Sequence, residues 1–243
     1  PVCLASPLRD VYKRQEYTNV KVVKGSKFKV KYNGDNKVNL VNKNKTLKIS
    51  EVKNVDRGYA INLNPFRKDD NQIVIEVPNI KLNELKGYSK NSSYYIKNIN
   101  SKNMNLINYS NPITLNSVNV ENSDVNSYAT HFNINNSILK NANFNIEKGF
   151  ISVSKSDISN SIFLLGSGNI SFNKMSPRND IKASTKKGDI YYSYKDKPEN
   201  TLLKLQPGKG KSIIENKHFH ESKVGKSDNI LEFYTVDGDI VIK

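Results

Sequence analysis

Hydrophobic and polar residues alternate through the middle of this chain, and between residues 103 and 179 the alternation repeats with a period of about 19 residues. The repeat aligns the apolar residues in four columns. These are Leu106, Val125, Phe144 and Phe163; Ile113, Phe132, Ile151 and Ile170; Leu115, Ile134, Val153 and Phe172; and Val120, Leu139 and Ile158. The second and third columns are offset by two positions, which is the period of a strand with one buried face. A fixed period of this length is typical of stacked repeats, in which each unit buries its apolar face only against its neighbours.

Two polar columns indicate corners between the predicted strands. Asparagine recurs at the same interval, at Asn103, Asn122, Asn141, Asn160 and Asn179. Asparagine tolerates the left-handed backbone conformation, and stacked side-chain amides can hydrogen-bond from one repeat to the next. The second column consists of the turn-compatible residues Asn111, Thr130, Gly149 and Gly168.

We therefore predict an all-β fold, a right-handed parallel β-solenoid with about 19 residues per coil, in which equivalent side chains stack about 4.8 Å apart. Residues 16–80 carry strand patterns that do not follow the period, and we expect them to form an N-terminal β cap over an open end. Residues 81–194 hold the repeats. A slip of one residue is expected near Pro177, because Ile190 lies one position further from Ile170 than the period places it. Residues 195–243 are expected to form an irregular basic loop followed by closing strands.

The segment 1–15, PVCLASPLRDVYKRQ, differs in composition from the asparagine-rich and lysine-rich remainder. It resembles translated sequencing-adapter read-through, especially in its PLRDVYKRQ ending. We expect residues 1–15 to be non-native and disordered, and the natural N-terminus, with any export signal or anchor, to be missing.

Charge is the strongest signal in the overall composition. The chain has 38 Lys and Arg against 23 Asp and Glu, a formal net charge of +15, which attracts polyanions such as anionic lipid, nucleic acid or acidic wall polymer. Ordinary surface charge in a lysine-rich sequence is the alternative explanation. The single cysteine excludes an intrachain disulfide, and no apolar run is long enough to span a membrane as a helix.

Short motifs near the C-terminal end carry a family resemblance. Residues 188–192 and 238–242 both open with Gly-Asp-Ile, and FKVKYNG, LKIS and VPNIKLNEL occur earlier in the chain. Over residues 20–243 the sequence resembles the bacterial putative-adhesin family of β-strand-repeat proteins, which carries a domain-of-unknown-function label. The resemblance implies a β-solenoid, a cell-envelope setting and no known enzymatic activity, and some relatives are linked to envelope-stress sensing. In the middle of this chain, Asn and Ser replace the recurrent Ser-Gly-Asp turns of the family.

A search for catalytic and metal-binding residues yields no site, and we predict no cofactor. His218 and His220 would share one strand face, but only Glu215 and Glu221 could complete a metal site, so a solvated pair is the better interpretation. Residues 208–212, GKGKS, lack the first glycine and the strand–loop–helix context of a phosphate-binding loop. Four lysines around this segment remain as a candidate anion-contact patch: Lys204, Lys209, Lys211 and Lys217. Inside the repeat the acids Glu121, Asp124, Glu147 and Asp157 share no column, so no pair of catalytic carboxylates is visible.

These patterns predict a non-enzymatic, extracytoplasmic protein of the cell envelope or cell surface. It would act as an adhesin or an envelope-sensing module, binding through a basic, asparagine-rich repeat surface. The candidate partners are acidic wall polymer, surface glycan or an envelope protein, with no specific nucleic acid and no membrane span in this sequence. Two alternatives stay open: a polysaccharide-active β-helix enzyme, and a structural or regulatory module that associates with itself.

Overall fold

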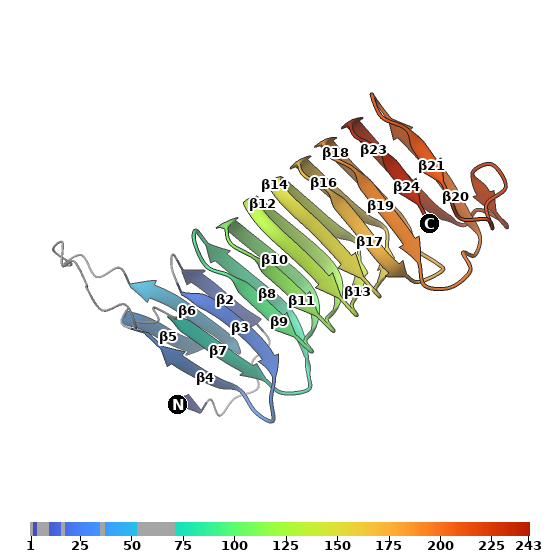
Figure 1. Cartoon of the computed structure of the whole chain (residues 1–243). Helices are drawn as coiled ribbons and strands as arrows, with labels where there is room; N and C mark the ends of the chain where they lie inside the picture. The colour runs from blue at the N-terminus through green and yellow to red at the C-terminus, as the bar shows by residue number, and fades with distance from the viewer. Residues whose placement is uncertain (1, 4–9, 16–17, 35–36, 53–70) are drawn as a thin grey trace, which may run out of the picture.

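The computed structural model describes residues 2–3, 10–15, 18–34, 37–52 and 71–243, and these form strands connected by turns. Figure 1 shows the strands stacked into an elongated array, with the two chain ends at opposite ends of the stack. All 24 strands of the described residues belong to one continuous sheet that winds around a single core. The fold is thus all-β and solenoid-like. Within the described ranges, no helix has the length and apolar character needed to cross a membrane.

The central strands pair in parallel, and chain order equals stacking order there. They are β10 (Asn100–Ser110), β11 (Ile113–Asn116), β12 (Asn119–Asn135), β13 (Ile138–Lys140), β14 (Ala142–Ser154), β15 (Asp157–Ser159), β16 (Ser161–Ser167) and β17 (Ile170–Met175). Val125 lies opposite Phe144, which lies opposite Phe163, so paired residues are one sequence period apart. Phe132 lies opposite Ile151 in the same way. The predicted stacking of equivalent side chains is therefore confirmed in this region.

The four apolar columns predicted from the sequence form the core. Every member of these columns is buried, with at most 2% of its surface exposed. Aromatic rings run through the centre of the stack: Phe144 packs against Phe163 with ring centroids 4.6 Å apart, and Phe163 meets Phe172 edge to face at 5.2 Å. A strand buries one face only, so the polar residues between the columns face outward.

The C-terminal end departs from the simple order. Its strands are β18 (Ile181–Lys187), β19 (Ile190–Tyr194), β20 (Thr201–Pro207), β21 (Ser212–Ile214), β22 (Lys223–Val224), β23 (Asn229–Asp237) and β24 (Ile240–Ile242). Of the last two strands in sequence, β23 lies between β18 and β20, and β24 lies between β19 and β21. The outermost coil in Figure 1 therefore comes from β20 and β21, within residues predicted to be irregular.

The N-terminal end shows the same kind of insertion. Its strands are β1 (Val2–Cys3), β2 (Asp10–Gln15), β3 (Asn19–Lys24), β4 (Lys29–Asn33), β5 (Lys37–Lys43), β6 (Thr46–Val52), β7 (Gln72–Val77), β8 (Lys81–Ser89) and β9 (Tyr94–Lys97). The early strand β2 lies between β6 and β8, and β3 lies between β7 and β9. All four of these pairings are parallel. Among the described residues of this end, β1, β4 and β5 add antiparallel pairs.

The structure differs from the boundaries expected from the sequence in two respects. Residues 1–15 were expected to be disordered, but Asp10–Gln15 forms β2, because its backbone pairs with strands on both sides; residues 1 and 4–9 lie outside the described residues. The parallel stack also extends beyond the predicted range of 81–194 in both directions. The slip of one residue is present, since Ile170 lies opposite Ile190 and Ser161 opposite Ile181.

Candidate functional site

An asparagine ladder runs along one corner of the central coils. Asn122 donates from Nδ2 to Oδ1 of Asn103 over 3.0 Å, Asn141 donates to Asn122 over 3.2 Å, and Asn160 donates to Asn141 over 2.7 Å. Each amide thus bonds to the equivalent amide of the next coil, as expected from the sequence column. The ladder presents an exposed, uncharged polar edge of regular spacing.

Asn179, the fifth member of the sequence column, does not continue this ladder. Its side chain turns inward and is only 2% exposed. There its Oδ1 accepts the backbone N–H of Ile158 over 2.7 Å, and its Nδ2 donates to the Tyr192 hydroxyl over 3.0 Å. The side chain therefore satisfies a backbone group that strand pairing leaves free at this point. Burial raises the pKa of Tyr192 well above its ordinary value.

Glycines and aspartates form a second corner, which explains the repeated Gly-Asp-Ile motif. Gly168 and Gly188 adopt φ of 127° and 135°, and a Cβ on Gly168 would lie 1.7 Å from the carbonyl oxygen of Gly149 in the neighbouring coil. Beside them, Asp189 Oδ1 accepts the backbone N–H of Asp239 over 2.8 Å, and Asp239 Oδ1 accepts that of Lys211 over 2.8 Å. Residues 208–211 are therefore the outermost corner of the stack and not a phosphate-binding loop.

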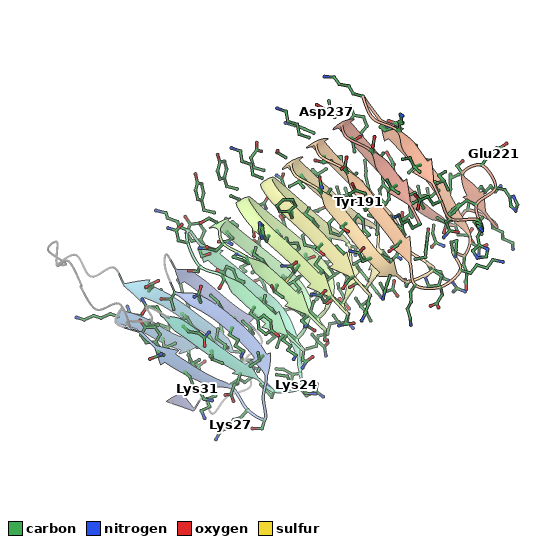
Figure 2. All side chains as sticks on the ribbon, viewed as in Figure 1. Lys24, Lys27, Lys31, Tyr191, Glu221 and Asp237 are labelled. Atoms are coloured by element: carbon green, nitrogen blue, oxygen red, sulfur yellow. The ribbon has the colours of Figure 1, made fainter. Side chains whose placement is uncertain are left out.

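Tyr191 and the three histidines lie on outward-facing surface. The hydrogen bond that the Tyr191 hydroxyl donates to Asp189 raises the pKa of Tyr191, whose side chain lies on the face of β19 (Figure 2). His131 is exposed, and its ring meets that of Phe150 edge to face at 5.2 Å. His218 and His220 are also exposed. Across the described ranges, His, Cys, Asp and Glu form no group of three that could hold a metal ion.

The four lysines of the candidate anion patch all lie on the outermost C-terminal coil or just after it. Lys204 is on β20, Lys209 and Lys211 are in the corner between β20 and β21, and Lys217 follows β21. All four are exposed. Lys204 also lies in register with the acidic Glu232 of β23. The structure thus brings the four ammonium groups to one end of the stack.

A groove crosses β8, β10, β12 and β14 on the outer face of the stack, with a volume of about 570 Å³. Three tyrosines and an isoleucine line it, together with amide and charged side chains. The full lining is Tyr88, Ser89, Lys90, Ile107, Asn108, Tyr109, Asn126, Ser127, Tyr128, Asn145 and Glu147. Tyr109 and Tyr128 stack with ring centroids 4.9 Å apart and an angle of 9° between their planes. They are 55% and 42% exposed, and Ile107 beside them is 45% exposed.

Buried polar side chains lie below the groove, and a lysine ammonium lies beside its tyrosines. Below the groove, Ser89 donates to Oδ1 of Asn108 over 2.7 Å, and Asn108 donates to the backbone carbonyl of Asn111 over 2.9 Å. The ammonium of Lys148 lies over the ring of Tyr128, 5.4 Å from its centroid. The ring of Tyr128 therefore lies between the ring of Tyr109 on the preceding coil and the ammonium of Lys148 on the following coil.

Sequence reasoning missed this groove, although one signal could have found it. Tyr109 and Tyr128 are separated by the same interval as the apolar residues and therefore share a column. The predicted columns included apolar residues and asparagine but no outward-facing aromatic residue. A tyrosine column would have predicted a stacked pair on the surface.

Comparison with known proteins identifies the family. The family model described as Toastrack DUF4097 matches residues 10–243. The chain belongs to this family. The Toastrack match includes β2, within the segment expected to be foreign. It confirms the resemblance drawn from the sequence to a family of β-strand-repeat proteins of unknown function.

The Toastrack chain has a structural counterpart among solved proteins but none among curated ones. No curated protein matches it. A crystal structure described as a "putative cell adhesion protein" from Clostridium sporogenes aligns over 98% of this chain and 93% of that chain, with 14% sequence identity and a TM-score of 0.30.

The four acids of the Toastrack repeat lie apart from one another. Glu121 pairs with Lys81, and the ammonium lowers the pKa of the Glu121 carboxyl. Asp124 accepts a hydrogen bond from Asn126 over 2.8 Å, and Glu147 lines the groove. Asp157 lines a different hollow, beside Lys155 and Lys174. This arrangement does not place two carboxyl groups across one site.

Proposed function

We propose that this chain is a non-enzymatic protein of the bacterial cell envelope, located outside the cytoplasm, that acts as an adhesin or an envelope-sensing module. The observation that carries the proposal is the register of the stack. Equivalent outward-facing residues lie directly above one another, as the Asn103–Asn122–Asn141–Asn160 ladder illustrates. A rigid array of this kind can make many weak contacts with a repeating polymer, and repetition then raises the apparent affinity.

The proposed partners are acidic wall polymer, surface glycan or an envelope protein. The net charge of +15 supports an acidic polymer, because a cationic surface attracts polyanions at long range. The patch of Lys204, Lys209, Lys211 and Lys217 is the proposed contact, since all four are exposed at one end of the stack. The proposal of a non-enzymatic role is supported by the separation of the acids within the repeat.

Finer features of the architecture belong to the same proposal. We propose that the coils wind right-handed, following the general preference of parallel crossovers. A coil length equal to the sequence period is supported by the pairing of Val125 with Phe144 and of Phe144 with Phe163. We retain residues 16–80 as the proposed N-terminal cap, in which the antiparallel strands β4 and β5 add to the edges of β7 and β6.

Binding of the purified protein to immobilised wall teichoic acid tests the charge part of the proposal, with neutral dextran as the reference surface. Binding should weaken steeply as added salt shortens the Debye length from about 10 Å to about 3 Å. Replacing lysines 204, 209, 211 and 217 by glutamine should weaken it further at low salt. Binding that does not depend on salt, or no binding, would contradict the proposal.

The matched control changes lysines 24, 27, 37 and 43 to glutamine, which removes the same charge from exposed positions. In Figure 2 the labelled Lys24 and Lys27 lie at the opposite end of the stack from Glu221, which follows Lys217 in the chain. An equal loss of binding in both variants would place the contact elsewhere than on the proposed patch.

A further inference from the structure

The two tyrosines, Tyr109 and Tyr128, form an exposed aromatic platform of two rings stacked face to face, in which each ring covers one face of the other. Their rings are nearly parallel, at 9°, and 4.9 Å apart, a separation close to the spacing of neighbouring strands in a sheet. Each ring is held in place by its neighbour, and tyrosine has few side-chain torsions to restrict. Little conformational entropy is therefore lost when a ligand lies against such a platform.

The groups around the platform favour an uncharged, hydroxyl-rich ligand. Asn126, Asn145 and Glu147 bring amide donors, amide acceptors and a carboxylate to the same groove. Lys90 adds a positive charge on the coil preceding Tyr109, and Glu147 adds a negative charge on the coil following Tyr128. The volume of about 570 Å³ lies within the range of about 300–1,000 Å³ that small-ligand sites occupy.

From this chemistry we infer that the groove binds a short stretch of a neutral oligosaccharide. The apolar C–H face of a pyranose ring packs on Tyr109 and Ile107, and its hydroxyls hydrogen-bond to the amides and to Glu147. Aromatic side chains combine an apolar body with a polar end, which suits a ligand that has one apolar face and a polar rim. The inference rests on the proposed function in one respect, namely that the repeat surface binds a glycan without cleaving it.

An acidic polymer is a poor occupant of this groove. Glu147 is exposed within it, and Asp124 lies on the same face, where it accepts a hydrogen bond from the groove residue Asn126. These two carboxylates equal in number the two cations near the tyrosines, Lys90 and Lys148, so the groove has no excess of positive charge to attract uronate or phosphate groups. The lysine patch of the proposed function is on the outermost C-terminal coil, several coils away from β12. Neutral and acidic ligands would thus use different parts of the surface.

Titration of the labelled full chain by NMR tests the inference, with cellotriose and the N-acetylglucosamine trimer as neutral probes and trigalacturonate as the acidic probe. At least one neutral trimer should shift the amide signals of residues 88–90, 107–109, 126–128 and 145–147. Tyr109→Ala should weaken that binding about tenfold, since a stacked aromatic contact is lost. Tyr109→Phe keeps the ring and should retain it.

Tyr234→Ala is the matched control, because Tyr234 is exposed to a similar extent, 44%, but lies on β23. It should leave binding of the neutral trimers unchanged. The inference is overturned if neither neutral trimer binds, if only trigalacturonate binds, or if Tyr234→Ala weakens binding as much as Tyr109→Ala does.

Failure of the groove and failure of the proposed function are distinguishable. The variant with glutamine at 204, 209, 211 and 217 should bind the neutral trimer normally. Trimer binding without salt-dependent binding of teichoic acid overturns the lysine patch and leaves the groove. The reverse result overturns the groove alone. Chromatography of the trimer after incubation should recover it intact, and cleavage would contradict the non-enzymatic role.

Discussion

The centre of the stack and its two ends consist of the same kind of strand. They differ in how the order of strands along the chain relates to their order in the stack. In the centre, each coil follows its predecessor in sequence, from β10 to β17. At the C-terminal end, β23 and β24 lie between the coil of β18 and β19 and the coil of β20 and β21. At the N-terminal end, β2 and β3 lie between strands that come later in the chain.

The difference changes which strands lie at the outer edge of the stack. A chain that only added coils would end on a strand with one unpaired edge, which invites pairing with other molecules. Here β24, the last strand, is paired on both edges, and all of its residues are buried. The outermost coil instead carries Pro207 and the exposed Lys204, which discourage edge-to-edge association.

The largest expected effect comes from the glycine corner, where the centre and the end can be compared directly. Gly168→Ala should prevent native stacking in the centre, because its Cβ would lie 1.7 Å from the carbonyl oxygen of Gly149. We expect a loss of more than about 4 kcal/mol in the free energy of unfolding. Gly210→Ala creates a similar clash, 2.0 Å from the carbonyl oxygen of Gly238, but on the outermost coil. It should detach that coil only.

Urea unfolding and native-state hydrogen exchange measure these two effects. Gly168→Ala should lower protection throughout the stack, whereas Gly210→Ala should lower it mainly in residues 201–214. Ser167→Ala, an exposed neighbour of Gly168, is the control and should change stability little. Equal global destabilisation by both glycine variants would mean that the end coil is as firmly coupled as the central coils.

A second comparison uses core side chains of the two regions. Phe163→Ala removes a ring that packs between Phe144 and Phe172, so it should lower the free energy of unfolding by about 3–5 kcal/mol. Leu205→Ala acts on the half-buried side chain of β20 and should lower it by about 1 kcal/mol. Chemical denaturation monitored by circular dichroism provides both values. A larger loss for Leu205→Ala would contradict the proposed weakness of the end coil.

The central coils could be predicted from the sequence because each structural equivalence there is a constant distance along the chain. The columns through Phe132 and Phe144 needed only the repeat period, and the same period predicted the asparagine ladder. The ends could not be predicted in this way. Phe233 lies opposite Ala183 and Leu231 lies opposite Leu203, and these two separations along the chain differ from each other and from the repeat period. Long-range insertion of a strand leaves no periodic signal.

Asn141 and Asn179 belong to one sequence column, but Asn141 is exposed and Asn179 is buried, a difference that the column does not predict. This difference provides the third prediction. Asn179→Ala should lower the free energy of unfolding by about 1–3 kcal/mol, because the buried N–H of Ile158 and the Tyr192 hydroxyl each lose a partner. Asn141→Ala removes the ladder bonds to Asn122 and Asn160 and a bond to the backbone carbonyl of Glu121, but these are exposed, so water can substitute for them and the loss should be less than about 1 kcal/mol. Thermal and urea unfolding of both variants test the order, and similar losses would contradict the buried role of Asn179.

The smallest expected effect is the acid dependence of the ion pair between Lys81 and Glu121, which links β8 to β12 across the intervening β10. The hydrogen bond and charge of Lys81 lower the pKa of Glu121 below its ordinary value of 4.5 in the folded chain. A carboxyl with a lowered folded pKa stabilises the fold at pH values above its unfolded pKa, and this contribution disappears as the pH falls through the folded pKa.

The wild type should therefore exceed Glu121→Gln in melting temperature slightly at neutral pH, and the difference should vanish as the solution is acidified well below pH 4.5. Both partners are exposed to solvent, so screening keeps the difference small and added salt should reduce it further. A difference that persists in strong acid would mean that Glu121 acts through packing and not through its charge.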